Sequence, residues 1–407
     1  MTTDILDELD LRALGRELQQ ARKRSGLTQE QAATILGAAR TTLTAIEKGE
    51  RRIRPDELIT LARTYNRQVS DFVRVRPAIE PFEVQFRGPA TLSEVDRARI
   101  DPLIVDLQEL ARNYLELEEI VGNPLARRYP DEFAVAGLNT DTAAEELATR
   151  ERARLNLGDA PLPVLRDILE QEVGLRIFYL KFPQRFSAMY FYDHTLGGCI
   201  AINSDHPEDR RRWSLAHDYG HFLVSRYKPV LYVENAYVRR PESERFVDLF
   251  AMYFLMPTSS VSRRFNDIRR AKAKVTPADL CILAHYFGVS FEALMGRLEG
   301  MKLVATGLLD KLRAGGFKIR DAQQVLGLAP IPARESVLPL RYQYLALEAL
   351  DRELITEGRF ARLMQLDRLE ARQLVDLLRD EIGIAEDSDQ PVGLDLAQSL
   401  DAEEEHS

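Results

Sequence analysis

Apolar residues recur at helical spacing in short runs along the first part of the chain. Leu11, Leu14 and Leu18 fall on one face of a helix, and similar short runs, separated by tight links, continue to residue 74. This pattern predicts five short helices over residues 11–74. The residues expected at helix ends are Thr28, Gly37, Gly49 and Pro55.

The segment that follows these helices is rich in proline. Residues 77–100 contain three prolines and a glycine, which exclude a continuous helix, so we expect a linker with one strand at 82–86. A long amphipathic helix rich in Leu and Glu follows at 94–121. A spacer and a dimer contact are both consistent with that helix.

From residue 142 to 297 the pattern mixes helices with short apolar strands, and it becomes wholly helical from Arg210 onward. This order predicts an α+β domain. Several more helices are expected over residues 305–382. The expected strands are 175–180, 188–192 and 198–203.

Composition sets the broad class. A length of 407 residues indicates two or three domains, and 45% hydrophobic with 29% charged residues is typical of a soluble globular protein. No apolar run of 18 residues and no signal peptide stands out, so we expect a cytoplasmic protein without a membrane partner. The two cysteines, Cys199 and Cys281, form no CxxC pattern, which argues against disulfides and thiolate zinc sites.

Charge is unevenly distributed around the net value of -9. Residues 11–76 carry 14 basic and seven acidic side chains, a local charge of +7 that suits a polyanionic partner. The tail from Glu386 has eight acidic residues and neither Lys nor Arg. We expect this tail to be disordered.

Residues 28–49 have the plan of a helix-turn-helix. Ala33 allows two helices to cross closely, Gly37 permits the turn, and Leu43 and Ile46 anchor the second helix. The pattern of Gln, paired Ala, turn Gly and closing Glu-x-Gly resembles the XRE (phage-repressor and Cro-like) helix-turn-helix family. The resemblance implies binding to double-stranded DNA.

By this resemblance, Gln29 would touch phosphate, Arg40 and Thr41 would reach base edges, and Lys48 and Arg51 would grip the backbone. Ala39 departs from the family, which usually has a capping Ser or Thr there. A helical bundle used only for protein contacts is the alternative. The side chains expected to face DNA are Gln29, Arg40, Thr41, Thr42, Thr44, Lys48 and Arg51.

A second motif lies in the mixed region. His217 and His221 are spaced i, i+4, so both imidazoles share one face of an apolar helix, at a separation that suits one metal ion. Asp218 follows the first His, where metallopeptidases place a base. Glu244 lies 23 residues after His221, and Asp248 follows one turn later, where it can hold a ligand imidazole. A pair of polar contacts in a helical core is the alternative for the histidines.

With these motifs, residues 148–297 resemble the ImmA/IrrE metallopeptidase family, whose members commonly act on repressors encoded beside them or fused to them. The resemblance implies that His217, His221 and Glu244 bind Zn²⁺ and that Asp218 is the catalytic base. It also implies a repressor-type protein substrate. The other matching segments are 154–156, 200–203, 211–217, 250–257 and 283–290.

Two positions depart from that family, which has Glu at 218 and Asn at 248. The shorter Asp218 side chain withdraws its carboxylate by about 1.5 Å, which would cost a general base about a hundredfold in rate. Three hypotheses therefore stay open. They are a zinc endopeptidase in stress response or mobile-element control, a weak or inactive zincin-like domain that senses a metal or peptide, and an antitoxin-like protein.

Two further residue sets carry weaker hypotheses. His194 is a candidate for transition-state stabilisation, with a surface loop as its alternative. The strand at 198–203 is a candidate sheet edge for an extended substrate, with a plain core strand as its alternative. Residues 338–382 resemble the helical tail of fusions of these two families, where packing on the peptidase and dimerisation are both open.

The fold class expected is mainly α with an α+β metallopeptidase domain: a five-helix N-terminal domain, a central zincin-like domain with a small sheet, and a helical C-terminal region. The predicted divisions are 1–76 for the helix-turn-helix domain, 77–141 for the linker and long helix, 142–300 for the zinc metallopeptidase domain, 301–385 for the C-terminal helices and 386–407 for the tail.

Overall fold

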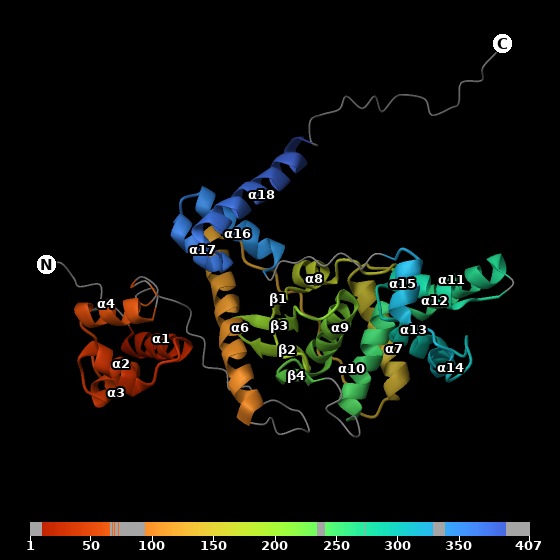
Figure 1. Cartoon of the computed structure of the whole chain (residues 1–407), viewed down its shortest axis with the longest axis horizontal. Coiled ribbons are helices and arrows are strands. Elements are labelled where there is room, and N and C mark those ends of the chain that lie inside the picture. Colours follow the sequence, from red (N-terminus) through yellow and green to blue (C-terminus); the bar gives the residue numbers. More distant parts are fainter. Residues whose placement is uncertain are drawn as a thin grey trace, which may run out of the picture. The chain divides into compact units, whose positions relative to one another are not determined.

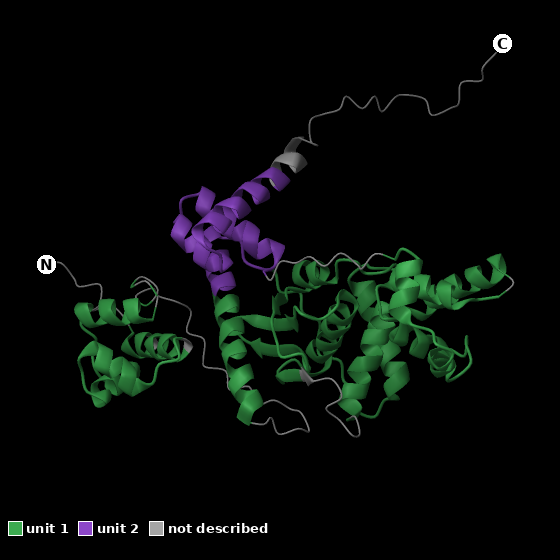
Figure 2. Cartoon of the chain, in the orientation of Figure 1, with its two compact units in different colours: residues 1–112, 126–333 green, residues 113–125, 334–407 purple. Residues whose placement is uncertain are grey.

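The computed structural model is mainly helical with one small mixed sheet, as predicted. It forms two compact units, and the division between them falls within helix α6 (Glu94–Val121) (Figure 2). The linker at 77–93 with its predicted strand, most of the expected fifth helix and the tail from 388 lie outside the described residues. The described residues are 10–65, 67, 69, 72, 94–233, 241–272, 274–328 and 338–387.

The N-terminal helices end where turn chemistry predicts. Thr28 caps α2 by accepting a hydrogen bond from the Gln31 amide, and Gly37 ends α2 in the left-handed region at φ 67°. Leu18, Leu43 and other apolar side chains form a separate small core. The helices are α1 (Leu11–Arg24), α2 (Gln29–Leu36), α3 (Arg40–Glu47) and α4 (Pro55–Thr64).

The sheet has four strands in the order β1-β3-β2-β4, with β1 parallel to β3 and the other neighbours antiparallel. The three predicted strands are present. The prediction of a wholly helical region from Arg210 was wrong, because β4 interrupts it. A strand of four residues is too short to show a clear alternation. The strands are β1 (Arg176–Leu180), β2 (Phe186–Asp193), β3 (Gly197–Asn203) and β4 (Val230–Val233).

Three helices stack on this sheet in layers. Helix α9 (Glu208–Ser225) packs on β2, β3 and β4, α10 (Glu242–Leu255) packs on α9, and α7 (Thr140–Arg154) packs on α10 (Figure 1). Gly220 permits the close approach of α9 and α10, because an added Cβ there would lie 3.0 Å from the Phe250 ring. This approach brings side chains of α9 and α10 to one place.

The remaining helices of the first unit extend the same core, and α14 packs against it through Leu308 and Leu312. In the part of the chain that the structure describes, no single helix has the length and apolar composition to cross a membrane, although the bent pair α12 and α13 meets that test jointly. These elements are α8 (Leu165–Ile168), η2 (Leu169–Val173), α11 (Thr258–Ala271), α12 (Pro277–Phe287), α13 (Phe291–Gly300), α14 (Leu308–Ala314) and α15 (Ile319–Val325).

The second unit combines the C-terminal part of α6 with three helices. The Tyr342 ring is fully buried and meets Tyr114 edge-on at 5.3 Å, and its hydroxyl donates to the Leu363 carbonyl at 3.1 Å. Buried Tyr342 therefore ties α16 to both α6 and α17. The helices are α16 (Leu340–Asp351), α17 (Glu357–Met364) and α18 (Arg368–Asp387).

Candidate metal centre and nucleic-acid interface

Two imidazoles and one carboxylate converge between α9 and α10. His217 and His221 are one turn apart and buried, and Glu244 comes from the first turn of α10. The Glu244 carboxylate lies 3.4 Å from His217 Nε2 and 3.5 Å from His221 Nε2. One ligand atom from each residue lies within 4.8 Å of the others, so the three groups could hold a single metal ion.

Asp248 orients the first of these histidines. The His217 Nδ1 atom lies 3.0 Å from Asp248 Oδ1, at hydrogen-bonding distance, and this contact turns Nε2 toward Glu244. A carboxylate at Nδ1 fixes the tautomer and the ring plane of an imidazole that binds metal through Nε2. Asp248 thus lies one turn after Glu244 and contacts the imidazole that the sequence analysis expects it to hold.

The polar atoms fit a cation. His221 Nε2 is buried, and no other group in the described part of the chain forms a hydrogen bond with it. Buried polar atoms are almost always paired, so an unsatisfied imidazole nitrogen beside a carboxylate is chemically suited to a metal ion. The residues present therefore match the donor set of a mononuclear site with imidazole and carboxylate ligands.

The protonation states are strongly coupled. Burial opposes the charged form of His217, but its hydrogen bond with Asp248 and the adjacent Glu244 carboxylate outweigh burial and raise its pKa to about 9. Burial, with the nearby His217 charge, lowers the pKa of His221. Burial also works against ionised Glu244, but contacts with both imidazoles prevail and hold its pKa well below the usual range. The carboxylate of Glu244 is therefore ionised and ready to bind a cation.

Asp218 is the most unusual acid of this region. It is fully buried, and neither carboxylate oxygen has a hydrogen-bond partner among the residues that the structure describes. Burial is the main cause that raises its pKa to about 7, and the charge of Glu244 adds to the rise. An acid with this pKa can take up and release a proton near neutral pH.

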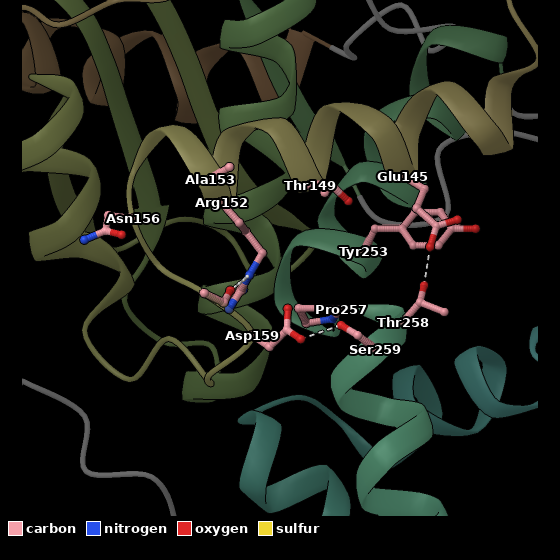
Figure 3. Close-up of a pocket in the computed structure, with 11 residues that line it drawn as sticks. Glu145, Thr149, Arg152, Ala153, Asn156, Asp159, Tyr253, Pro257, Thr258 and Ser259 are labelled. Carbon is pink, nitrogen blue, oxygen red and sulfur yellow. Dashed lines mark hydrogen bonds between the residues drawn. The ribbon is translucent and has the colours of Figure 1, made fainter.

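A large cavity lies away from these ligands. Its volume is about 590 Å³, and α7, the end of α10 and the start of α11 line it (Figure 3). Glu145, Arg152 and Tyr253 are among its lining residues, whereas His217, His221 and Glu244 are not. The cavity and the candidate metal centre are therefore separate features.

Two weaker hypotheses have different outcomes. Strand β3 is central in the sheet and is paired on both sides by β1 and β2, so the hypothesis that it forms a substrate-binding edge was wrong. All seven of its residues are buried, as in a plain core strand. His194 lies in an exposed turn after β2, where its ring stacks on Tyr227 at 6.0 Å.

In the N-terminal domain, the side chains expected at DNA fall into two groups. Arg40, Thr41 and Lys48 are exposed on or directly after α3, and Thr42 is half-buried on the same helix. Ala39 precedes α3 and makes no side-chain cap, because alanine has no polar side-chain atom. These exposed positions remain open to a ligand.

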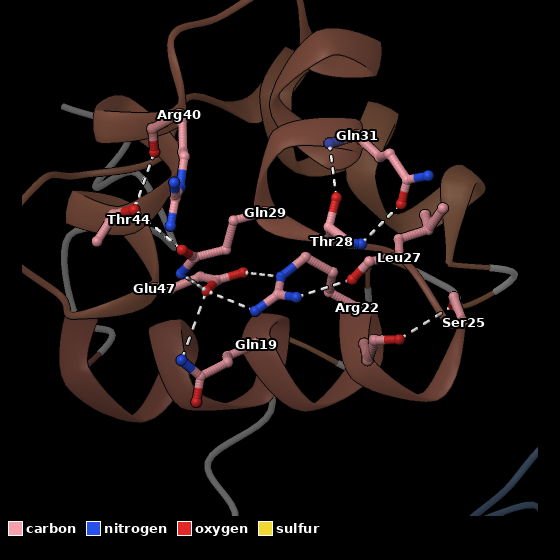
Figure 4. Close-up of polar contacts among 11 residues, drawn as sticks. Gln19, Arg22, Ser25, Leu27, Thr28, Gln29, Gln31, Arg40, Thr44 and Glu47 are labelled. Atoms are coloured by element: carbon pink, nitrogen blue, oxygen red, sulfur yellow. Dashed lines mark hydrogen bonds and ion pairs between the residues drawn. The ribbon is translucent and has the colours of Figure 1, made fainter.

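Gln29, Thr44 and Arg51 make bonds within the domain instead. Gln29 donates to Glu47 at 2.9 Å and accepts from the Thr44 hydroxyl (Figure 4). Arg51 forms two hydrogen bonds of 3.0 Å with Glu57. Nothing in the sequence analysis predicted that Glu47 and Glu57 hold these side chains. The signal available in the sequence is an acid that lies beside buried apolar positions near the end of a helix.

Comparisons with known proteins agree with both resemblances. Residues 13–72 match a helix-turn-helix domain family, and residues 170–299 match the family described as IrrE N-terminal-like domain. No curated protein sequence matches the chain. Similar solved structures include PlcR of Bacillus thuringiensis in complex with the peptide PapR7 and DNA, at 11% identity, with 94% of this chain and 99% of that chain covered and a TM-score of 0.18. ComR from Streptococcus suis is 11% identical, with coverages of 92% and 96% and a TM-score of 0.15.

TM-scores this low carry no argument about fold or function. Both matches lie in one chain and leave the C-terminal helices unassigned. The protein thus joins a helix-turn-helix domain of the DNA-binding type to a peptidase-like domain of the IrrE N-terminal-like family.

Proposed function

We propose that this protein is a DNA-binding transcriptional regulator whose central domain is a zinc-dependent endopeptidase that cleaves a repressor-type protein. One observation carries the proposal. His217, His221 and Glu244 converge in a buried site, and Asp218, a buried acid without a hydrogen-bond partner in the described residues, follows the first histidine.

Zinc is the metal that this donor set favours. Two imidazoles with one carboxylate form the ligand set of many catalytic zinc sites, in which a fourth position stays open for water or substrate. When bound, the ion would supply a Lewis acid that polarises a peptide carbonyl and activates water. His217, His221 and Glu244 would hold it.

The remaining side chains would move and hold protons. An Asp218 oxygen would accept a proton from the attacking water and later donate it to the leaving amine. In the metal-free protein, burial raises the pKa of Asp218 to about 7, so this carboxyl can gain or lose a proton near neutral pH. Asp248 would keep the His217 ring oriented through Nδ1. In this proposal, Asp218 would transfer the proton and Asp248 would orient a ligand imidazole.

The N-terminal domain would bind double-stranded DNA through α3. Arg40 and Thr41 are exposed at the start of that helix, where side chains of a recognition helix reach base edges. Lys48 lies just after its end and would contact phosphate. A homodimer is part of this proposal because such domains commonly read two half-sites.

A second candidate function is a metal or peptide sensor without efficient catalysis. The short side chain at position 218 favours it, because the Asp carboxylate lies about 1.5 Å further back than a Glu carboxylate would. Metal binding does not depend on that distance, since Asp218 is not one of the three converging groups.

Three proteins separate the two functions: wild type, Asp218→Ala and Asp218→Glu, each loaded with Zn²⁺ and incubated with a peptide library and with repressor proteins from the same cell. Products would be identified by mass spectrometry. The endopeptidase predicts cleavage by wild type and a loss of about a hundredfold in Asp218→Ala. Cleavage by Asp218→Glu alone would favour the sensor, and equal rates in wild type and Asp218→Ala would exclude Asp218 as the base.

A further inference from the structure

Helix α9 has a second anchor on the side away from its histidines. Tyr219 lies two residues after His217 and two before His221, so its side chain points roughly half a helical turn away from both. It is fully buried. Its hydroxyl donates to a Glu151 carboxylate oxygen at 2.6 Å. The helix that carries the histidines is therefore attached to α7 at its back.

Arg154 completes a closed set of hydrogen bonds. Its guanidinium donates to the Tyr219 hydroxyl at 3.0 Å and to Glu151 at 2.8 Å. Glu151 is only 1% exposed, so its charge has lost almost all contact with water. Because leaving one member of a buried polar set unpaired is costly, the three groups hold a single relative position.

The same helix α7 also holds α10, which carries Glu244. The Thr140 hydroxyl donates to Glu242 at 2.8 Å in the first turn of α10, two residues before Glu244. Arg152 donates to the Phe254 carbonyl at 2.5 Å near the other end of α10. Helix α7 is thus bonded to both helices whose side chains converge.

We propose that Tyr219, Glu151 and Arg154 are positioning residues for the metal centre. They set the rotation of α9 relative to α10, and so the distance between the two imidazoles and Glu244. The inference rests on the proposed function, in which those groups bind a metal ion. It also extends the functional domain to α7, which lies outside the matched residues 170–299.

The test compares two Tyr→Phe variants of the full-length protein. Tyr219→Phe removes the hydroxyl and keeps the ring. Tyr342→Phe is the matched control, because Tyr342 is equally buried and its hydroxyl also has a protein acceptor, in the second unit. Three quantities are measured: Zn²⁺ affinity by competition with a chromophoric chelator, the visible spectrum of the Co²⁺-loaded protein, and unfolding of the metal-free protein in urea.

We expect Tyr219→Phe to bind Zn²⁺ up to about tenfold more weakly, the lower end of the loss for a group bonded directly to a ligand, because Tyr219 acts only through the position of α9. Its Co²⁺ spectrum should also change, because the spectrum reports ligand geometry. Tyr342→Phe should lose comparable stability but keep the wild-type affinity and spectrum. Wild-type affinity and spectrum in Tyr219→Phe would overturn the inference.

A second variant covers the case in which Tyr219→Phe does not fold. The Arg154 side chain is about a quarter exposed, and Arg154→Lys keeps a positive charge beside buried Glu151 while it removes the guanidinium that contacts the Tyr219 hydroxyl. It should weaken Zn²⁺ binding about threefold to tenfold, and unchanged binding would overturn the inference. Absence of Zn²⁺ binding by the wild-type protein would instead overturn the proposed function itself, which the wild-type measurement alone reveals.

Discussion

The helix-turn-helix domain and the peptidase-like domain each bury a carboxylate, but in opposite ways. Glu47 accepts hydrogen bonds from Arg22, Gln29 and Gln19 and is 4% exposed. Asp218 is fully buried and has no hydrogen-bond partner in the described residues. Neighbouring side chains balance the charge of Glu47, whereas both carboxylate oxygens of Asp218 remain available to accept hydrogen bonds.

This difference separates a structural acid from a functional one. A paired buried charge fixes the geometry of the elements it joins, and here Glu47 joins α1 and α2 to the end of α3. An unpaired buried acid costs stability and persists only where the site needs it. The comparison therefore assigns Glu47 to folding and supports the proposal that Asp218 is the catalytic base.

The largest expected effect is on folding of the helix-turn-helix domain. Glu47→Ala leaves the buried Arg22 guanidinium without its partner, which costs about 3–5 kcal/mol in the free energy of unfolding. Urea unfolding followed by circular dichroism measures this loss. Glu47→Gln, which keeps an acceptor, should lose less. A loss below about 1 kcal/mol in Glu47→Ala would show that Glu47 is not an anchor.

Asp218 should show the opposite behaviour, with a pH dependence of defined sign. Its pKa rises from 3.8 in the unfolded chain to about 7 in the folded metal-free protein, so folding disfavours its ionised form. The resulting destabilisation is absent below about pH 4, grows between pH 4 and 7 and is constant above. Relative to Asp218→Asn, the wild-type free energy of unfolding should therefore fall by on the order of 4 kcal/mol between pH 4 and 8.

Chelator-treated wild type and Asp218→Asn, unfolded in urea at several pH values, provide the measurement. Groups that do not interact with residue 218 titrate alike in both proteins, so the difference reports this position together with its charge interactions with His217 and Glu244. Parallel stability curves for the two proteins would mean that Asp218 is solvated or paired, and the contrast with Glu47 would disappear.

The contact of α9 with α10 is the next test. Gly220→Ala places a Cβ 3.0 Å from the Phe250 ring and 3.1 Å from Val247 Cβ, so the helices must separate by a few tenths of an ångström. Overpacking of this kind costs about 1–3 kcal/mol. We expect weaker Zn²⁺ binding as well, because the ligands come from both helices. Gly296→Ala, where no atom lies within 4 Å of the added Cβ, is the control for substitution of a helical glycine.

The smallest effects concern DNA. Exposed Arg40 should contribute to base choice, so Arg40→Ala should reduce discrimination between operator sequences by about 1–3 kcal/mol. Arg51 is paired with Glu57, and Arg51→Ala should change affinity by less than about 1 kcal/mol without changing sequence preference. Binding-site selection with both variants measures this difference. Equal effects would show that Arg51 leaves Glu57 to contact DNA.

Much of the fold was predictable from local pattern. Thr28, Gly37 and Pro55 mark helix ends through their own backbone chemistry, and each lies at the predicted end. The i, i+4 spacing of His217 and His221 places both rings on one face wherever the helix lies. Such features depend on neighbouring residues in the chain and can be read from one sequence.

The rest depends on contacts between distant segments. The short strand β4 exists because it pairs with β2, and no pattern within four residues reveals that pairing. Hydrogen bonds to Glu47 and Glu57 hold the side chains of Gln29 and Arg51 within the domain. These acids compete with DNA for the donor groups of Gln29 and Arg51. The bond between Tyr219 and Glu151 spans 68 residues, so only the packed structure reveals it.

The most direct test of the metal centre is the zinc content of the purified full-length protein after loading with Zn²⁺ and removal of excess metal. We predict one ion per chain in wild type and none in Glu244→Ala, whereas Asp218→Ala retains the ion. Wild-type protein without zinc, or Glu244→Ala protein with a full complement of zinc, would contradict the proposed metal centre.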